Sequence, residues 1–532
     1  MRAALYWAKF LHAAGVQRVF GHPGTESIEL IEAANEVGLD FVLTHHEATA
    51  GFAASMTGRL TRVPGVCVIT AGPGATNIAS AVAQAHLDRM PLLVFTGDHS
   101  MGPGQPRHQR LPPDLFAPIA RATIRLAAST LREDLPRALD IASRHPQGPV
   151  YVTFPSDEML LDVGDDAPLV ARRPSTPAAL TGDLARARVM IESAARPLLI
   201  AGLGVTAAGA EEQFRQLASA LGAPVADTPQ GRGSFPTDDP RYVGTFATHR
   251  DAGVAAVADA SDLVIAVGLD SAEFLKPWQL SGPVLSLTSS GVGADPAIPV
   301  EHAVSGPLDT LLAELSRAAK PAGQWNADQL AQLSGRGADP RGRTPVGAPD
   351  SAMWPQAVVD ALQDLLPADA IVSVDVGSHK LLMVQRWVVH VPGTFLNSSG
   401  MSSMGTGIPF ALAASLARPG RQVVAVVGDG GLLMYAGELA TMARLSAKLV
   451  VVVMADSALY SIKIKQLRRS YRPIGTEFPG VRVADVARSF GLSAERAETA
   501  NALRVALRQA LDAGGPAVIE AVVDPAGYEL SQ

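Results

Sequence analysis

The chain has 532 residues, 47% of them hydrophobic and 18% charged, and its 44 basic and 51 acidic residues give a formal net charge of −7. This composition predicts a compact globular protein and argues against a largely disordered one. A net negative charge gives no overall attraction to a polyanion, so neither a nucleic acid nor an anionic membrane is an expected partner.

Neither a membrane span nor a secretory signal is expected. The longest apolar runs, residues 423–427 and 449–455, are shorter than the roughly 18 residues that a span needs. The N-terminal segment MRAALYWAKFLHAAGV has apolar residues at helical spacing and predicts an amphipathic helix. The single cysteine, Cys67, excludes an intrachain disulfide and a cysteine metal cluster, and it lies in an apolar run where burial is expected. We therefore expect a cytoplasmic protein.

Along the chain, short apolar runs alternate with longer helical patterns in three blocks. Two segments rich in Pro, Gly and Asp, residues 162–183 and 334–350, are the expected linkers. The predicted domains are therefore residues 1–165, 183–333 and 351–532. Strands are expected at residues 19–20, 41–43, 66–70, 92–96, 198–201, 225–226, 263–267, 371–374, 423–427 and 449–454, and helices at 47–59, 75–88 and 433–445.

Continuous Val/Ile/Leu runs joined by helical crossovers are typical of parallel sheets covered on both faces. The pattern predicts an α/β protein with three doubly wound parallel sheets. In such sheets, ligands bind at the carboxyl ends of the strands.

Acidic residues follow two neighbouring strands of the third block. The strand at 423–427 leads into Gly428-Asp429-Gly430-Gly431, and the next strand leads into Ala455-Asp456. Glycines let the backbone approach a phosphate, and two acids with a backbone carbonyl and phosphate oxygens suit octahedral Mg²⁺. An ordinary strand-to-helix turn with Asp456 as a helix cap explains the same spacing.

In the first block, Glu47 follows the strand at 41–43 in the segment Thr44-His45-His46-Glu47. An acid at this point is typical of a helix start, where it interacts with the helix dipole. His46 is either a polar residue of the same helix start or a group that faces a ligand. The pattern alone leaves these alternatives open.

Together, these segments resemble the thiamine diphosphate enzymes, and in particular the large subunits of acetolactate synthases. The family's diphosphate-binding motif is GDG followed by an Asn-Asn pair, which here reads Ala455-Asp456. The resemblance continues over FGHPGTE, THHEATAGFAASMTGRLTRVPGVCVITAGPGATN and HLDRMPLLVFTGD in the first block and over SSGMSSMGTGIPFALAASLA in the third. It implies a pyrimidine-binding, a central Rossmann-like and a diphosphate-binding domain, and Asp456 keeps an oxygen ligand while adding a negative charge.

The resemblance also implies roles for single residues. Glu47 matches the glutamate that contacts N1′ of the cofactor's aminopyrimidine and so promotes deprotonation of thiazolium C2, the carbon that attacks a 2-keto acid. Met404 matches the bulky residue between the two cofactor rings, although it could equally be packing in a Gly/Ser-rich loop, and the Ser402 carbonyl would accept a hydrogen bond from N4′. Gln109 matches a loop glutamine that faces the cofactor, but an exposed loop residue is an equal alternative.

The expected site has three parts. The catalytic group comprises Glu47, His46 and Gln109. The metal ligands are Asp429, Asp456 and Ala458. The cofactor contacts are Pro23, Glu47, Ser402, Met404, Gly428, Asp429, Gly430, Gly431, Asp456, Ala458 and Leu459.

The middle block contains a second glycine pattern. Gly202-Leu203-Gly204-Val205-Thr206-Ala207 follows an apolar run, and Asp227 stands where a dinucleotide-binding domain has its acid. The resembling family uses this domain for FAD, for another nucleotide, or for no ligand. We interpret the glycines as structural and do not expect FAD.

The segment after Asp456 bears on the substrate. Ser461 and Lys465 fall where the anabolic acetolactate synthases have a Met and a Trp that line the acceptor pocket. Lys463, Lys465 and the nearby Arg468, Arg469 and Arg472 form either a solvated basic helix face or a site for an acidic or phosphorylated substrate.

The expected function is decarboxylation of a 2-keto acid with carboligation, dependent on thiamine diphosphate and Mg²⁺. The alternatives are a decarboxylase that does not ligate and a non-catalytic protein that binds a nucleotide or flavin. Since Glu47 and Asp429 belong to different domains, the resemblance implies a homodimer or homotetramer with the active site at the subunit interface.

Overall fold

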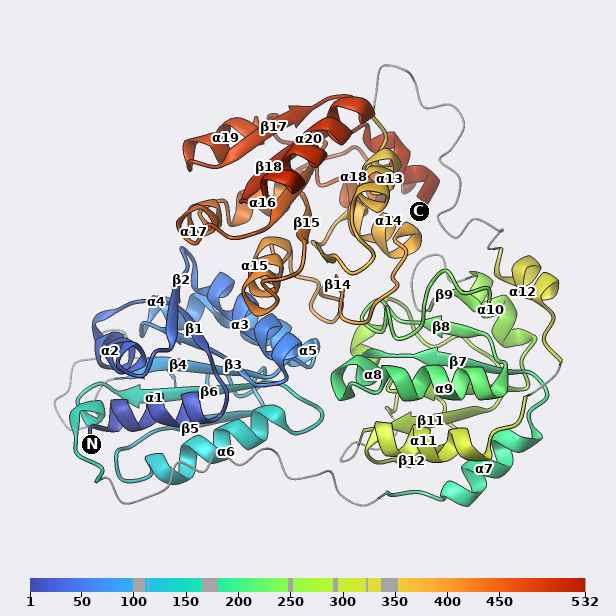
Figure 1. Cartoon of the computed structure of the whole chain (residues 1–532), viewed down its shortest axis with the longest axis horizontal. Helices are drawn as coiled ribbons and strands as arrows, with labels where there is room; N and C mark the ends of the chain where they lie inside the picture. The colour runs from blue at the N-terminus through green and yellow to red at the C-terminus, as the bar shows by residue number, and fades with distance from the viewer. Residues whose placement is uncertain are drawn as a thin grey trace. The chain divides into compact units, whose positions relative to one another are not determined.

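The computed structural model describes residues 1–98, 111–112, 114–164, 180–246, 252–289, 295–321, 324–335 and 353–531. They form three six-stranded sheets in which every paired strand is parallel, and helices flank each sheet (Figure 1). The predicted α/β class with three doubly wound sheets is confirmed. Within the described residues, no helix is both long and apolar enough to cross a membrane.

The first sheet has the strand order β2-β1-β3-β4-β6-β5. Its strands are β1 (Arg18–His22), β2 (Asp40–Leu43), β3 (Gly65–Ile69), β4 (Leu92–Asp98), β5 (Ala122–Arg125) and β6 (Pro149–Pro155). Its helices are α1 (Ala3–Ala13), α2 (Ile28–Glu36), α3 (Glu47–Thr61), α4 (Pro73–Asn77), α5 (Ala79–Leu87) and α6 (Leu131–Ser143), with 3₁₀ turns η1 (Thr25–Ser27) and η2 (Glu158–Leu160). The predicted amphipathic first helix is α1, which buries Trp7 and Phe10. Cys67 is buried as expected, and burial raises the pKa of its thiol well above the usual range.

The central sheet has the order β12-β11-β10-β7-β8-β9. Its strands are β7 (Pro197–Ala201), β8 (Val225–Asp227), β9 (Tyr242–Thr245), β10 (Leu263–Val267), β11 (Val284–Thr288) and β12 (His302–Ser305). Its helices are α7 (Leu184–Ser193), α8 (Leu203–Ala208), α9 (Glu211–Leu221), α10 (Ala252–Asp259), α11 (Leu308–Ala318) and α12 (Ala327–Ser334), with η3 (Ser271–Glu273).

The third sheet has the order β14-β13-β15-β16-β18-β17. Its strands are β13 (Ile371–Val374), β14 (Phe395–Leu396), β15 (Val423–Gly428), β16 (Val450–Ala455), β17 (Ser493–Ala497) and β18 (Ala517–Val522). The helices of this part of the chain are α13 (Pro355–Leu365), α14 (Ser378–Arg386), α15 (Gly407–Ala417), α16 (Asp429–Met434), α17 (Glu438–Arg444), α18 (Tyr460–Arg468), α19 (Val483–Ser489) and α20 (Ala500–Ala513), with η4 (Pro525–Ser531).

Two predicted helices are interrupted. The helix expected at 433–445 is divided between α16 and α17, because the chain turns at 435–437 and a Cβ on Gly437 would lie 3.1 Å from Cβ of His45. The helix expected at 75–88 is divided between α4 and α5 at Ile78. Helical spacing of apolar residues does not reveal such one-turn breaks.

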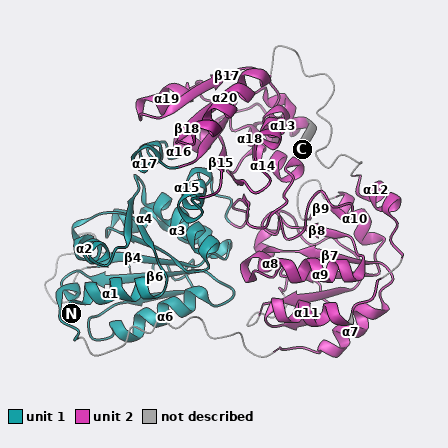
Figure 2. Ribbon diagram, in the orientation of Figure 1, with its two compact units in different colours: residues 1–176, 401–419, 435–447 teal, residues 177–400, 420–434, 448–532 magenta. Residues whose placement is uncertain are grey.

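By its internal contacts, the chain divides into two compact units (Figure 2). Unit 1 comprises residues 1–176, 401–419 and 435–447, and unit 2 comprises residues 177–400, 420–434 and 448–532. The central and third sheets therefore belong to one unit, while α15 and α17 join the first sheet. In unit 1, α15 packs on α3, the helix that begins with Glu47.

Candidate active site

The carboxyl edge of the third sheet brings the two predicted acids together. Strands β15 and β16 are adjacent and parallel, with Gly428 opposite Met454, so Asp429 and Asp456 leave the sheet at the same edge. Asp429 accepts hydrogen bonds from the N–H groups of Gly430 (2.8 Å) and Ser457 (2.7 Å). We call Gly428, Asp429 and Asp456 the C-terminal edge.

The buried carboxyl group of Asp429 opposes ionisation of the neighbouring, half-buried Asp456. Burial raises the pKa of Asp429. Burial and then the charge of Asp429 raise the pKa of Asp456 to about 7, while the charge of Lys463 acts in the opposite direction. A bound divalent cation would relieve this repulsion. No group of three His, Cys, Asp or Glu side chains in the described residues could hold a metal, so further ligands would be backbone or phosphate oxygens, as Mg²⁺ prefers.

The backbone next to Asp456 is fixed by a second segment. The Ala458 N–H donates to Asp456 Oδ1 (3.0 Å), and the Leu459 N–H donates to the Thr476 carbonyl (2.7 Å). Ala458 also forms an isolated bridge with Glu477. The predicted contacts at 458 and 459 therefore lie in an ordered turn directly beside the acid pair.

His379 belongs to the same edge, and the sequence interpretation missed it. It lies in the first turn of α14, just after β13, and a Cβ on Gly428 would be 3.3 Å from its Cε1. Burial lowers the pKa of His379 to about 4, and its Nε2 has no hydrogen-bond partner in the described residues. A buried polar atom normally has a partner, so the one for Nε2 must come from outside these residues. The other ring nitrogen is held by the Asp375 backbone, so in the neutral ring Nε2 is an acceptor and a donor group would complete it.

Glu47 is the buried acid of unit 1. It is the first residue of α3 and is 8% exposed. Asn77 Nδ2 donates to its Oε2 (3.0 Å), and a Cβ on Gly74 would lie 3.3 Å from Oε1. Within the described residues no cation pairs with Glu47, so Asn77 orients a carboxyl group whose other oxygen faces a glycine. Asn77 was also missed, although it stands in the segment GPGATN directly after β3.

His46 has a structural role at the helix start. It is the N-cap of α3, and its Nδ1 accepts a hydrogen bond from the Ala48 N–H (3.0 Å). Its ring packs edge-on against Tyr435, with ring centroids 5.1 Å apart. The helix-start interpretation of His46 therefore holds, and a catalytic role for it stays a prediction.

The other predicted cofactor contacts of unit 1 lie in loops. Pro23 is exposed just after β1. Ser402 has a left-handed backbone (φ 54°), and Met404 is half-buried two residues later, before α15. Gln109 lies outside the described residues. The cofactor contacts expected of Pro23, Ser402 and Met404 stay predictions.

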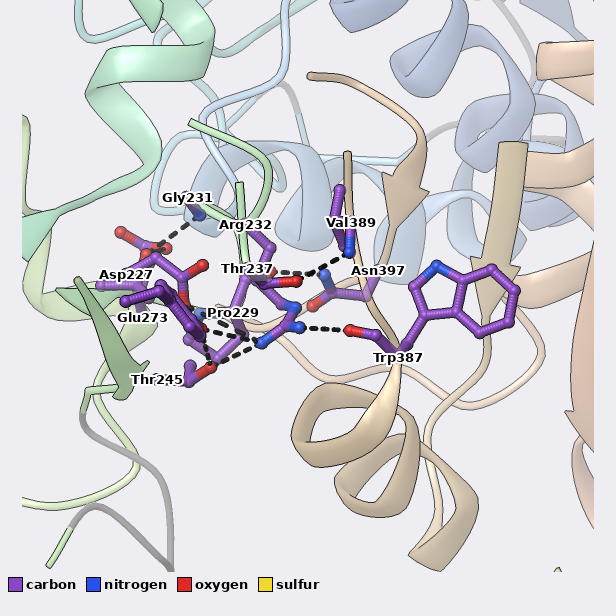
Figure 3. A network of polar contacts seen from close by, with 12 residues as sticks. Asp227, Pro229, Gly231, Arg232, Thr237, Thr245, Glu273, Trp387, Val389 and Asn397 are labelled. Carbon is purple, nitrogen blue, oxygen red and sulfur yellow. Dashed lines mark hydrogen bonds and ion pairs between the residues drawn. The ribbon is translucent and has the colours of Figure 1, made fainter. Parts of the chain in front are cut away.

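At the carboxyl ends of the central strands, polar side chains bond to one another and to the backbone (Figure 3). We call Gly202, Gly204, Asp227 and Glu273 the central edge. A Cβ on Gly202 would be 2.4 Å from the Gly268 carbonyl oxygen, and one on Gly204 would be 2.7 Å from Gly268 Cα. Glu273, itself buried, accepts from the Leu203 N–H (2.9 Å) at the start of α8 and from the Thr228 hydroxyl.

Asp227 also forms contacts with other side chains of the central part of the chain. It accepts a hydrogen bond from the Tyr242 hydroxyl (2.8 Å) and lies 3.9 Å from Nη1 of Arg232, whose Nη2 donates to the Trp387 carbonyl (2.6 Å). A dinucleotide would need the N–H groups at the start of α8 and a free acid after β8. Glu273 already takes the Leu203 N–H, and Gly268 fills the space beside both glycines, so these residues do not fit the diphosphate of FAD and the glycines serve close packing.

The basic residues near α18 are mostly exposed. Lys463 pairs with Glu477, whereas Lys465, Arg468, Arg469 and Arg472 form no ion pair with another described residue. Ser461 is half-buried. The solvated-face interpretation therefore describes four of these five cations.

In comparisons with known proteins, a family model matches each of the three parts of the chain that contain a sheet. Models of the thiamine pyrophosphate enzymes match the chain with the N-terminal TPP binding domain over residues 1–109, the central domain over 184–315 and the C-terminal TPP binding domain over 375–521. The Pseudomonas aeruginosa protein named "Probable 2-ketoarginine decarboxylase AruI" is 32% identical over 95% of this chain and 91% of its own length. The chain belongs to the thiamine pyrophosphate enzyme family.

Acetolactate synthases are also among the similar proteins. The acetolactate synthase of Bacillus subtilis is 28% identical over 96% of this chain and 91% of its own length. The large subunit of Escherichia coli acetolactate synthase isozyme 2 is 29% identical, with 98% and 96% covered. The protein is thus a thiamine pyrophosphate enzyme similar to the acetolactate synthases.

Proposed function

We propose that this enzyme uses thiamine diphosphate and Mg²⁺ to decarboxylate a 2-keto acid and to join the remaining fragment to a second carbonyl compound. The observation that carries the proposal is the pair of neighbouring acids, buried Asp429 and half-buried Asp456, whose pKa values are raised at the strand ends beside Gly428. This set of groups suits a diphosphate with a divalent cation.

Each residue has a stated task. Asp429, Asp456 and the Ala458 carbonyl hold Mg²⁺, while the backbone at Gly430, Gly431 and Leu459 lies against the diphosphate. When bound, thiamine diphosphate supplies the electron sink that lets a 2-keto acid lose CO₂.

In unit 1, Glu47 holds a proton at N1′ of the aminopyrimidine, and Asn77 keeps its carboxyl group in one orientation. Pro23, Ser402 and Met404 contact the cofactor rings, and His46 and Gln109 face the reacting carbon. Glu47→Gln should lower kcat roughly 10²- to 10⁴-fold while Mg²⁺-dependent cofactor binding is retained. Unchanged activity in this variant would contradict the assignment.

A decarboxylase that does not ligate is the second candidate. The relative named as a 2-ketoarginine decarboxylase favours it, as does Lys465 at the position where the anabolic acetolactate synthases have their acceptor Trp. Pyruvate and 2-ketoarginine should be supplied with and without an aldehyde, and the products weighed by mass spectrometry. A product heavier than the decarboxylated donor by the mass of the acceptor establishes ligation, and the free aldehyde alone establishes simple decarboxylation.

We further propose that the active enzyme is a homodimer or homotetramer in which Glu47 of one chain and Asp429 with Asp456 of a second chain act on one cofactor. Inactive Glu47→Gln and Asp429→Ala chains, mixed and reassociated, should then regain partial activity, because a mixed dimer contains one intact site. If both residues serve one site within a single chain, mixing restores nothing.

A further inference from the structure

The backbone immediately before Glu47 is held by one buried carboxylate from a distant part of the chain. Glu438, the first residue of α17, is 1% exposed. Its Oε1 accepts hydrogen bonds from the N–H groups of His45 (2.9 Å) and His46 (3.1 Å). Its Oε2 accepts from the Thr441 hydroxyl (2.7 Å). Both carboxylate oxygens are thereby used.

These two N–H groups have no alternative acceptor in the sheet. Strand β2 ends at Leu43, and α3 begins only at Glu47, so residues 44–46 belong to neither element. Both hydrogen bonds to Glu438 are partly buried, and a charged acceptor forms hydrogen bonds about twice as strong as a neutral one. Glu438 therefore fixes the direction in which the chain enters α3.

Other residues of the segment 435–444 also contact the residues that precede Glu47. The Tyr435 ring packs edge-on against His46 and, with centroids 6.1 Å apart, against Phe52. The Arg444 guanidinium donates to the Leu43 carbonyl, and Gly437 allows the close approach to His45. Contacts therefore reach three of the four residues that precede Glu47, and all of them lie within unit 1.

We propose that Glu438 is a positioning residue for Glu47, a role that rests on the function proposed above. A carboxyl group that exchanges a proton with a ring nitrogen must be held to a fraction of an ångström, because misplacement by about 1 Å can cost 10²-fold in rate. Asn77 orients the end of the Glu47 side chain, and Glu438 fixes the backbone from which it projects.

The first test follows hydrogen exchange of the full-length protein, with and without thiamine diphosphate and Mg²⁺. Glu438→Ala should speed exchange in a peptide that covers residues 43–50. The matched control is Glu520→Ala, which removes another buried carboxylate that accepts a backbone N–H, from Ala484, and pairs with Arg496. The control should leave exchange in this peptide at the wild-type rate, and unchanged exchange in Glu438→Ala would overturn the proposal.

The second test is a double-mutant cycle on kcat. Glu438→Ala should lower kcat roughly 10- to 100-fold, with a smaller change in KM, when Glu47 is present. In the Glu47→Gln background it should leave the residual kcat unchanged, because there is no carboxyl group left to position. An equal fold-loss in both backgrounds would show that Glu438 acts only on stability or binding, which overturns the proposal.

A second variant and a readout that does not need turnover distinguish failure of this proposal from misfolding and from failure of the proposed function. If Glu438→Ala does not fold, Glu438→Gln keeps an oxygen acceptor for both N–H groups without the charge and should give a smaller loss of the same kind. If the wild type shows no turnover that depends on thiamine diphosphate, the proposed function fails. The exchange result still decides whether Glu438 holds residues 43–50.

Discussion

The C-terminal edge and the central edge have similar sequence patterns but opposite chemistry. In both, glycines follow one strand and an acid follows its neighbour: Gly428 with Asp456, and Gly202 with Asp227. At the C-terminal edge burial raises the pKa of both acids, the charge of Asp429 raises that of Asp456 further, and His379 Nε2 has no partner in the described residues. At the central edge Arg232 donates to the Trp387 carbonyl (Figure 3), and Glu273 accepts the N–H group at the helix start, although Arg232 Nε and Ser234 Oγ have no hydrogen-bond partner in the described residues.

The difference teaches that a glycine turn after a strand is no evidence of a ligand site by itself. What distinguishes the two edges is that Glu273 takes the N–H group at the helix start of the central edge, whereas two acids with raised pKa values lie next to each other at the C-terminal edge. Groups whose pKa values are strongly shifted by burial and by a neighbouring charge gather at functional sites, where a bound cation offsets the repulsion. The following variants test whether this distinction holds.

The largest expected effect comes from removing one acid at each edge. Asp429→Ala should weaken the affinity for thiamine diphosphate in Mg²⁺ by at least about 100-fold, because losing a metal ligand costs more than losing a group behind it. Asp227→Ala should lower the melting temperature, because Tyr242 loses its acceptor, without changing this affinity. Isothermal titration calorimetry measures the affinity of both variants for thiamine diphosphate in Mg²⁺. Equal losses of affinity would show that the two edges do not differ in cofactor binding.

The two edges also differ in how well the sequence predicted them. The apolar runs predicted β1–β4, β7, β8, β10, β13, β15 and β16 but not the other eight described strands, five of which lie at the sides of their sheets. The spacing of Asp429 and Asp456 predicted their pairing, because parallel strands align their carboxyl ends. Asn77, His379 and Glu438 were missed, since each acts through a contact across distant segments that periodicity does not report. The two central glycines, by contrast, match a ligand motif, and only the closeness of Gly268 shows that they serve packing.

Ligand-dependent stabilisation should separate the edges next. Thiamine diphosphate with Mg²⁺ at about 100 times its Kd should stabilise the folded protein by roughly 2.7 kcal/mol. FAD at the same concentration should leave the melting temperature unchanged, because Glu273 takes the N–H group that its diphosphate would need. A thermal-shift assay measures both, and a rise with FAD but not with thiamine diphosphate would reverse the roles of the two edges.

A smaller effect is expected from the pH dependence of Asp456. Its pKa of about 7 lies above the ordinary value of 3.8, so in the metal-free protein the folded state retains this proton between those values, whereas the unfolded chain releases it. Stability of the metal-free protein should therefore fall as pH rises from about 4 to 7. Metal binding needs the ionised form, so affinity for Mg²⁺ and cofactor should rise up to about tenfold between pH 6 and 7 and then level off.

Asp456→Asn is the matched variant for this pH effect. The amide keeps an oxygen ligand and cannot titrate. Cofactor affinity measured from pH 6 to 8 should therefore be flatter than in the wild type. The same slope in both proteins would mean that another group titrates.

The smallest functional effect should come from Glu273→Gln at the central edge. With its oxygen on the Leu203 N–H, the amide would donate to the Thr228 hydroxyl and remove the acceptor of that hydroxyl's own proton, and an unsatisfied buried group costs about 1–3 kcal/mol of stability. Because Glu273 contributes no group to the C-terminal edge, kcat and cofactor affinity should stay at wild-type values while the denaturation midpoint falls. If the variant instead retained flavin through dialysis, seen as absorbance in the visible range, the central edge would be a ligand site that this carboxylate keeps closed. The hydrogen bond from the Leu203 N–H to Glu273 would then block a ligand site, and it would not be evidence that no site exists.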